Sequence, residues 1–189
     1  MKKYLITPSL LNSWKYCIES GNLDNFLQTL NREEIQDREP LIKGNDFELY
    51  MVQNYPDTKN GCYQVKVYKE ILINGIRYLI YGKLDCLKAG KITDYKYTGN
   101  YEVGKFYGSY QTAIYMELVQ EAYEIEYLIS NNFNKDNVIG IWEEDKKQFN
   151  LFKETYKRSE LEINLEEEIR AFIKWLERLD LLKIYQEKW

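Results

Sequence analysis

Two aspartates and a lysine lie around one short turn of the sequence. Asp85 precedes the turn at Ala89-Gly90, and Asp94 and Lys96 follow it. If Ala89-Gly90 is the two-residue loop of a hairpin, Asp85 lies directly opposite Asp94. Because side chains alternate along a strand, Lys96 shares a face with Asp94. The spacing predicts two carboxylates and an ammonium in one space, unless a bulge at Gly90 shifts the register by one residue.

Facing carboxylates are either a cation site or part of a solvated hairpin with incidental ion pairs. In a ladder they repel, and each raises the pKa of the other unless a cation lies between them. Two neighbouring features favour the cation site. Gly82 lies three residues before Asp85, and Gln111 and Tyr115 share one face of the next predicted helix. Glu48, on an otherwise apolar helical stretch, is either a solvated position or a third acidic ligand.

The composition limits the chemistry that the chain can perform. Its 189 residues include no histidine, which excludes Ser-His-Asp and Cys-His nucleophiles, His-Cys zinc sites and His-metal nucleases. Three separated cysteines form no CxxC pair and indicate free thiols in a reducing compartment. A net charge of -4 argues against a global positive field, so any DNA contact must be local. Carboxylates, lysines and hydroxyls must therefore carry any chemistry.

The length and the 44% hydrophobic content predict one domain over residues 1–189. The N-terminal segment is a poor signal peptide, and no apolar run reaches the ~18 residues of a membrane span. We therefore expect a cytoplasmic protein that does not contact a membrane.

Helical and strand patterns follow one another in a mixed order. Thr7-Pro8 predicts a helix start and Asn74-Gly75 predicts a hairpin turn, while Asn164 with Glu167 predicts the start of a final helix that runs to Trp189. This order predicts an α/β (mixed α+β) fold with a central mixed sheet flanked by helices. The predicted helices cover residues 7–17, 22–30, 41–55, 106–121 and 164–189, the predicted strands 63–73, 76–87, 92–97, 122–130 and 138–142, with weak alternation over 149–156 and a mobile connection over 31–40.

In order and spacing, the motifs resemble those of the PD-(D/E)XK nuclease superfamily, specifically its RecB-like branch with phage-type recombination exonucleases. The resemblance covers roughly Thr7 to Tyr115, and the joint occurrence of the motifs is more specific than any one of them. It implies a restriction-endonuclease-like core. The motifs are TPSLLNSWKYC at 7–17, GNDFE at 44–48, GKLD at 82–85, DYK at 94–96 and QTAIY at 111–115, which fits the QxxxY helix of that branch.

The resemblance implies hydrolysis of DNA phosphodiester bonds with Mg²⁺ or Mn²⁺, hard cations that prefer oxygen ligands. Lys96 would orient the attacking water and stabilise charge in the transition state. Gln111 and Tyr115 would line the site and hold Lys96 or the DNA backbone, or else they are a buried polar pair capping the sheet. The implied metal ligands are Glu48, Asp85, Asp94 and the Tyr95 carbonyl.

Two departures from the family pattern matter. Many RecB-like members carry histidine where this chain has Glu48, which leaves the number of metal ions open. Some relatives hold an iron-sulfur cluster through one early and three late cysteines. No cysteine follows Cys86 here, so we expect no such cluster.

Basic and aromatic residues gather near these motifs. Residues 83–105 contain five lysines and three acidic residues, a local charge of +2 that suits phosphate. We expect linear DNA ends as substrate, with Tyr95, Tyr97, Tyr101 and Tyr107 available to stack on bases, although most tyrosines simply fill half-buried strand positions. The resemblance implies a phage or mobile-element setting beside a recombination or single-strand annealing protein, and it leaves a homo-oligomer open.

Four functions compete on this evidence. The leading one is a metal-dependent DNA exonuclease, which the QxxxY helix favours over a restriction-like endonuclease with the same metal core. A non-catalytic nuclease-like module that binds DNA or protein is disfavoured because all the acidic residues and Lys96 are present. An interaction protein whose C-terminal helix docks on a partner would instead expose apolar area there.

Overall fold

The computed structural model describes residues 3–33, 39–138, 148–161 and 164–189. A six-stranded sheet carries the strands in the order β1-β3-β4-β5-β6, and β2 also pairs with β3. The elements are β1 (Tyr4–Ile6), α1 (Pro8–Ser20), α2 (Leu23–Asn31), α3 (Glu39–Asn54), η1 (Pro56–Thr58), β2 (Cys62–Ile73), β3 (Ile76–Lys88), β4 (Lys91–Tyr97), α4 (Tyr110–Leu118), β5 (Glu124–Ser130), η2 (Lys135–Asn137), β6 (Phe152–Lys157), η4 (Arg158–Glu160), α5 (Leu165–Arg178) and α6 (Leu182–Lys188).

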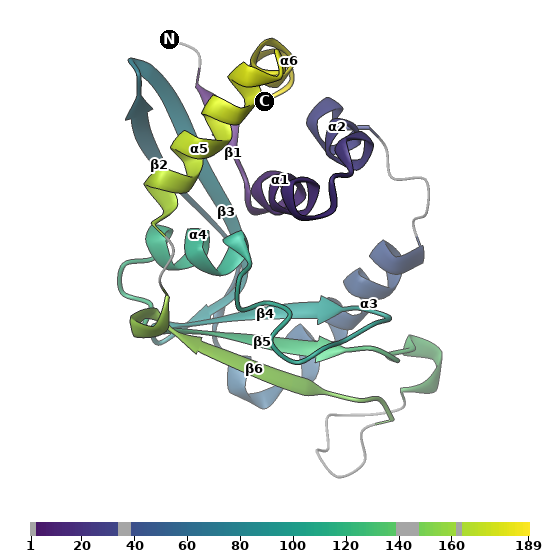
Figure 1. Cartoon of the computed structure of the whole chain (residues 1–189). Coiled ribbons are helices and arrows are strands. Elements are labelled where there is room, and N and C mark those ends of the chain that lie inside the picture. The colour runs from purple at the N-terminus through teal and green to yellow at the C-terminus, as the bar shows by residue number, and fades with distance from the viewer. Residues whose placement is uncertain (1–2, 34–38, 139–147, 162–163) are drawn as a thin grey trace.

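The sheet is mixed, and helices pack on it, which confirms the predicted fold class. The β1–β3 and β4–β5 pairs are parallel, whereas the β2–β3, β3–β4 and β5–β6 pairs are antiparallel. The long β2–β3 hairpin runs across the direction of β4, β5 and β6 (Figure 1). The sheet therefore bends where β4 branches from β3.

Strand alternation divides the core into two layers. On β5, Tyr127 and Ile129 join the large cluster of buried residues supplied by α1, α2, α4, α5 and α6. Leu128 points to the opposite face, where Phe47 and Met51 of α3 form a smaller cluster with Tyr95. Burial on both faces of the sheet is thus divided between α3 on one side and the other helices on the second side.

Both predicted hairpin turns are confirmed. Asn74 and Gly75 have φ of 51° and 77°, and Ala89 and Gly90 have φ of 50° and 77°. Two successive left-handed residues are the signature of a type I′ turn, whose twist matches that of the flanking strands. The register of each hairpin is thereby set by its turn, with Lys88 paired with Lys91 at the second turn.

Helix starts follow the predicted caps, but the end of the chain does not. The Thr7 hydroxyl accepts the Leu10 N–H, and the Asn164 side chain accepts the Glu167 N–H. A single helix to Trp189 is wrong, because the chain breaks between α5 and α6, where Asp180 has φ of 55°. The break is a turn that sequence periodicity alone did not reveal.

Other boundaries also differ from the prediction. The helix predicted over 106–121 is only α4, whose N-cap is Ser109. Strand β1 was not predicted, since a three-residue parallel strand depends on distant partners. Pro40 lies in the first turn of α3, whereas residues 34–38 of the expected connection lie outside the described residues. Of the strand predicted over 138–142, Val138 is not in a strand and the rest lies outside the described residues. No helix in the described ranges is long and apolar enough to cross a membrane.

Candidate metal and catalytic site

The two aspartates lie where strands β3 and β4 separate. The ladder between these strands runs from the turn to the pair Cys86–Thr93, and the next step in that register joins Asp85 to Asp94. Beyond it, β3 stays paired with β2 while Asp94 pairs with β5. The Asp85 carboxylate accepts the Tyr95 backbone N–H at 3.0 Å. The Asp85 side chain thus takes the place of a backbone acceptor for the Tyr95 N–H at the point where the β3–β4 ladder ends.

Asp94 is buried, with 1% of its surface exposed. One carboxylate oxygen, Oδ1, accepts a hydrogen bond from the Gln111 amide. The other, Oδ2, lies 2.7 Å from the Lys96 ammonium, and among the described residues no donor is aligned on it for a hydrogen bond. The predicted sharing of one face by Asp94 and Lys96 is therefore confirmed by direct contact. Asp94 Oδ2 is therefore already held against one cation, and a metal ion would have to compete with the Lys96 ammonium for this oxygen.

Glu48 reaches the same space from α3. The Gln64 amide donates to its carboxylate. Burial raises the pKa of Glu48, the nearby Lys83 lowers it, and Asp94 raises it. Burial also raises the pKa of Asp85 well above its usual range, and Asp94 raises it further. Three acidic side chains from α3, β3 and β4 therefore act on one another electrostatically, as carboxylates sharing a site do.

Lys96 supplies the opposing charge. Burial alone would lower the pKa of its ammonium, but the charge of Asp94 and the contact with it raise that pKa above its ordinary value, with further contributions from Asp85 and Glu48. The lysine is therefore held in its charged form by the carboxylates around it.

Helix α4 fixes one edge of the site through Gln111 and Tyr115. The Gln111 amide also donates to the Tyr115 hydroxyl at 3.1 Å, and that hydroxyl donates to the Lys83 carbonyl at 2.6 Å. A Cβ at position 82 would lie 2.9 Å from the Tyr115 ring, so Gly82 is required for this approach. The two side chains thus hold Asp94 and the backbone of β3; the structure shows neither of them bonded to Lys96.

The donor chemistry of these residues suits a hard divalent cation. Glu48, Asp85 and Asp94 offer carboxylate oxygens, and the buried Asp94 Oδ2 has no aligned hydrogen-bond donor in the described structure. The Tyr95 N–H faces Asp85, and because both polar groups of a strand residue face the same neighbour, its carbonyl faces that gap too. As the side chains stand, no three acidic or cysteine groups of the described residues are arranged to hold a metal. Binding would require the carboxylates to close up and the Lys96 ammonium to leave Oδ2.

The tyrosines predicted to stack on bases differ in their availability. Tyr95 is 6% exposed and its hydroxyl contacts Thr58, so the prediction that Tyr95 stacks on bases is wrong. The Tyr101 ring stacks on Phe152 with its hydroxyl bonded to Glu154. Tyr107 is half exposed, and the Lys43 ammonium lies 6.0 Å from the centre of the Tyr97 ring. These two remain accessible, but neither contacts the carboxylates in the interactions that the structure shows.

Gln64 contacts the candidate site through Glu48, and sequence reasoning missed it. It lies opposite Asp85 on β2, between the ladder pairs Tyr63–Cys86 and Val65–Leu84, and has φ of 53°. A left-handed non-glycine residue inside a strand is costly and marks a functional or strained position. A glutamine within a predicted strand gives no sequence signal for this role, because the backbone angle and the contact with Glu48 appear only in three dimensions.

Two substitutions of Gln64 should differ in their effect on stability but change metal affinity in the same direction. Gln64→Gly removes the strain of the left-handed backbone, stabilising by about 1 kcal/mol, whereas Gln64→Ala keeps the strain. Both remove the amide that holds Glu48, so we expect both to weaken Mg²⁺ or Mn²⁺ binding several-fold by calorimetry. Metal affinity that follows the thermal midpoint, rather than the loss of the amide, would contradict a positioning role.

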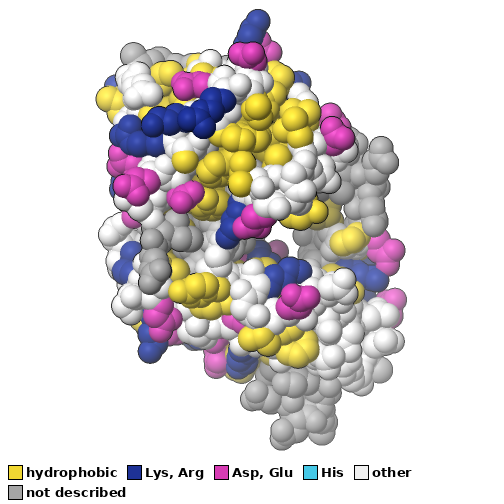
Figure 2. All heavy atoms as spheres, in the orientation of Figure 1, with side chains coloured by type: hydrophobic (Ala, Val, Ile, Leu, Met, Phe, Trp, Pro, Cys, Tyr) yellow, Lys and Arg dark blue, Asp and Glu magenta, His cyan; other side chains and the backbone are white. Residues whose placement is uncertain are grey.

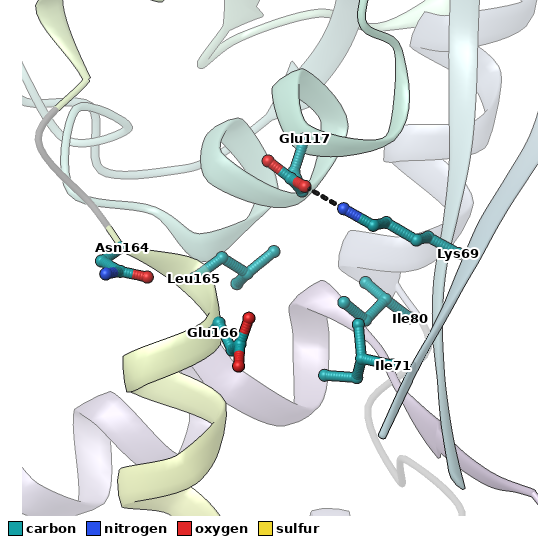
Figure 3. A pocket seen from close by; sticks show the side chains of 7 residues that line it. All are labelled: Lys69, Ile71, Ile80, Glu117, Asn164, Leu165 and Glu166. Carbon is teal, nitrogen blue, oxygen red and sulfur yellow. Dashed lines mark hydrogen bonds and ion pairs between the residues drawn. The ribbon is translucent and has the colours of Figure 1, made fainter. Parts of the chain in front are cut away.

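A separate pocket lies between β2, β3, α4 and α5 (Figure 3). The ion pair between Lys69 and Glu117 spans it, and Ile71 and Ile80 line its wall. None of the predicted site residues lines it. The candidate site is therefore defined by its carboxylates and not by this pocket.

Comparison with known proteins shows that the fold of this chain resembles that of a solved structure. No protein-family model matches the chain, and no curated protein sequence matches it. The solved structure of SSO0001 aligns with a TM-score of 0.56 and 14% identity over 93% of this chain and 77% of that one. A "putative exonuclease" from Eubacterium rectale aligns over 100% of this chain and 71% of that one, with 15% identity and a TM-score of 0.38. The first likeness shows a shared fold, and the second is too weak to support an argument.

Proposed function

We propose that this chain is a divalent-metal-dependent deoxyribonuclease of the PD-(D/E)XK type that degrades DNA from its ends. The observation that carries the proposal is the buried Asp94 carboxylate held 2.7 Å from the Lys96 ammonium, with the charges of Glu48 on α3 and Asp85 on β3 acting on the same space. Phosphodiester hydrolysis needs hard oxygen ligands for a cation together with a positive group near the phosphate. The residues in question are Glu48, Asp85, Asp94 and Lys96.

Mg²⁺ or Mn²⁺ would be held by the three carboxylates and the Tyr95 carbonyl, and when bound would polarise the phosphate and lower the pKa of the attacking water. Lys96, released from Asp94, would orient that water and stabilise the growing negative charge. Gln111 keeps Asp94 in place, and Tyr115 fixes Gln111 against β3. Many members of the family that the chain resembles have histidine at the position of Glu48. With glutamate there, the proposal is compatible with either one or two metal ions.

Preference for DNA ends follows from the distribution of charge. The chain is acidic overall, and its positive charge is gathered in local stretches such as residues 83–105, so we expect no broad basic surface to hold the middle of a duplex. Figure 2 shows a hollow between the upper and lower parts of one face, with lysine or arginine and acidic side chains along it. We further propose that the chain is a single-domain, cytoplasmic exonuclease, either a monomer or a homo-oligomer. It would act beside a recombination or annealing protein of a phage or mobile element. This setting rests on the family resemblance.

Linear and covalently closed circular DNA of one sequence should separate the candidate activities. With Mg²⁺ or Mn²⁺ we expect progressive loss of the linear form, little action on the circle, no activity in chelator and a steep fall with added salt. A gel time course measures all four. Discrete fragments from the circle, formed as fast as the linear DNA disappears, would favour a restriction-like endonuclease.

One observation favours a second candidate, a non-catalytic module that binds nucleic acid. The Asp94 charge is already matched by the Lys96 ammonium at 2.7 Å, so this carboxylate has a counter-charge without a metal. Inertness on both DNA forms, combined with measurable DNA binding, would favour this module over the nuclease.

A further inference from the structure

The β2–β3 hairpin has one packed face and one open face. On β2, Val65 and Val67 pack against the large core cluster, with α4 and α5 on that side of the hairpin (Figure 1). The alternate residues point away: Lys66 is exposed, and Tyr68 and Leu72 are 70% and 61% exposed. The open face of β2 therefore presents a lysine, a tyrosine and a leucine to solvent.

The register of the hairpin pairs like with like on this open face. Lys66 lies opposite Lys83, and Tyr68 lies opposite Tyr81. Side chains that face each other across an antiparallel pair lie on the same side of the sheet. The open face therefore presents a pair of lysines and then a pair of tyrosines, which we call the hairpin track: Lys66, Tyr68, Tyr81 and Lys83.

The hairpin track begins at the candidate metal site. Lys83 lies two residues from Asp85 on β3, and its charge acts on Glu48. From Asp85 to Tyr81 the strand spans four residues, or about 13 Å. The lysines are thus next to the carboxylates, and the tyrosines follow one step farther out.

Two lysines opposite each other are unfavourable unless an anion lies between or beside them. Lys83 acts on Glu48 only at longer range, and among the described residues neither Lys66 nor Lys83 has an acidic partner within ion-pair distance, whereas the next cations along this face, Lys3 and Arg77, both meet Glu70. In a chain with net charge -4, a positive pair without a close counter-ion suggests an anion that comes from outside the chain. Beside a phosphodiesterase site, that anion is the phosphate backbone of the substrate.

We propose that the hairpin track binds the single-stranded segment of DNA that leads to the metal site. Lys66 and Lys83 contact its phosphates, and Tyr68 and Tyr81 stack on its bases, which is the combination of charge and aromatic rings used by single-strand binding proteins. The position of the scissile phosphate at Asp85 rests on the proposed nuclease function. A protein partner suits this face less well, because lysine is depleted from the centres of protein interfaces.

The test measures binding of fluorescein-labelled oligo-dT and of a blunt duplex of equal length by anisotropy, in chelator so that no DNA is cut. We expect Tyr68→Ala to weaken oligo-dT binding at least about 5-fold. Lys66→Ala should flatten the dependence of log affinity on log salt by about 0.7. Tyr123→Ala and Lys174→Ala, which alter another exposed tyrosine (56%) and an exposed lysine on α5, should leave binding unchanged. Duplex binding should respond less than oligo-dT binding.

Cleavage of linear DNA by the same variants separates this inference from the proposed function. If the wild-type chain cleaves DNA while the Tyr68 and Lys66 variants bind and cleave like the controls, the hairpin track is overturned and the nuclease stands. If the track variants lose oligo-dT binding but the wild-type chain cleaves nothing, the track stands and the nuclease fails. A wild-type chain that binds no nucleic acid overturns both and leaves the open face to a protein partner.

Discussion

Asp85→Asn is expected to remove metal-dependent cleavage while leaving the fold slightly more stable. The amide still accepts the Tyr95 N–H through its oxygen, so the local backbone keeps its partner. It no longer repels Asp94 and Glu48, and relief of that repulsion should add up to about 1 kcal/mol to the free energy of unfolding. Loss of a ligand for a cation that supplies several kcal/mol of transition-state stabilisation should lower turnover by roughly 1,000-fold or more.

Asp94→Asn should also abolish cleavage but should not stabilise the chain. Its buried carboxylate balances Lys96 at 2.7 Å, and the neutral amide would leave that ammonium without its counter-charge. Asp180→Asn is a matched control, because Asp180 is exposed with φ of 55° and asparagine tolerates the left-handed conformation. Titration calorimetry with Mg²⁺ or Mn²⁺ and thermal melts measure both effects. Unchanged metal affinity in both site variants would refute the assignment of the metal ligands.

Local sequence signals were sufficient to bring together the residues at the centre of the candidate site. A two-residue turn at Ala89-Gly90 fixes the register of β3 and β4 as far as the pair Cys86–Thr93, and Asp85 and Asp94 are the next residues along the two strands. Alternation along β4 then places Lys96 with Asp94. The same alternation argues against Tyr95 as a stacking residue, because a side chain between Asp94 and Lys96 must point to the opposite face, where α3 covers it.

Features that depend on distant parts of the chain could not be predicted. The separation of β3 from β4 past the pair Cys86–Thr93 results from the competing partners β2 and β5. The left-handed Gln64 and its contact with Glu48 join residues from β2 and α3. β1 exists only because β3 offers it an edge. The break between α5 and α6 lets the Tyr185 hydroxyl reach the Leu5 carbonyl, a contact between the two ends of the chain.

Lys96→Gln is expected to separate catalysis from metal binding. The amide can still donate to Asp94, but it carries no positive charge to stabilise the transition state, so turnover should fall by ~100-fold or more. Metal affinity should stay the same or increase, because the ammonium 2.7 Å from Asp94 Oδ2 competes with a cation for that oxygen. DNA affinity should change much less than turnover. Single-turnover cleavage, calorimetry with Mn²⁺ and DNA-binding anisotropy measure the three quantities.

The pattern of these three changes is what identifies the role of the lysine. Lys96→Ala serves as a second variant, although it leaves the buried Asp94 without a partner and should lower stability. Lys174→Ala on α5 controls for the loss of one positive charge elsewhere on the chain. A lysine that only balances the charge of Asp94 would, once replaced, raise metal affinity without loss of turnover. If Lys96 contacts the reacting phosphate, both variants must have lower turnover than the wild-type chain, even where their metal affinity rises. Equal turnover in Lys96→Gln and the wild-type chain would exclude that catalytic role.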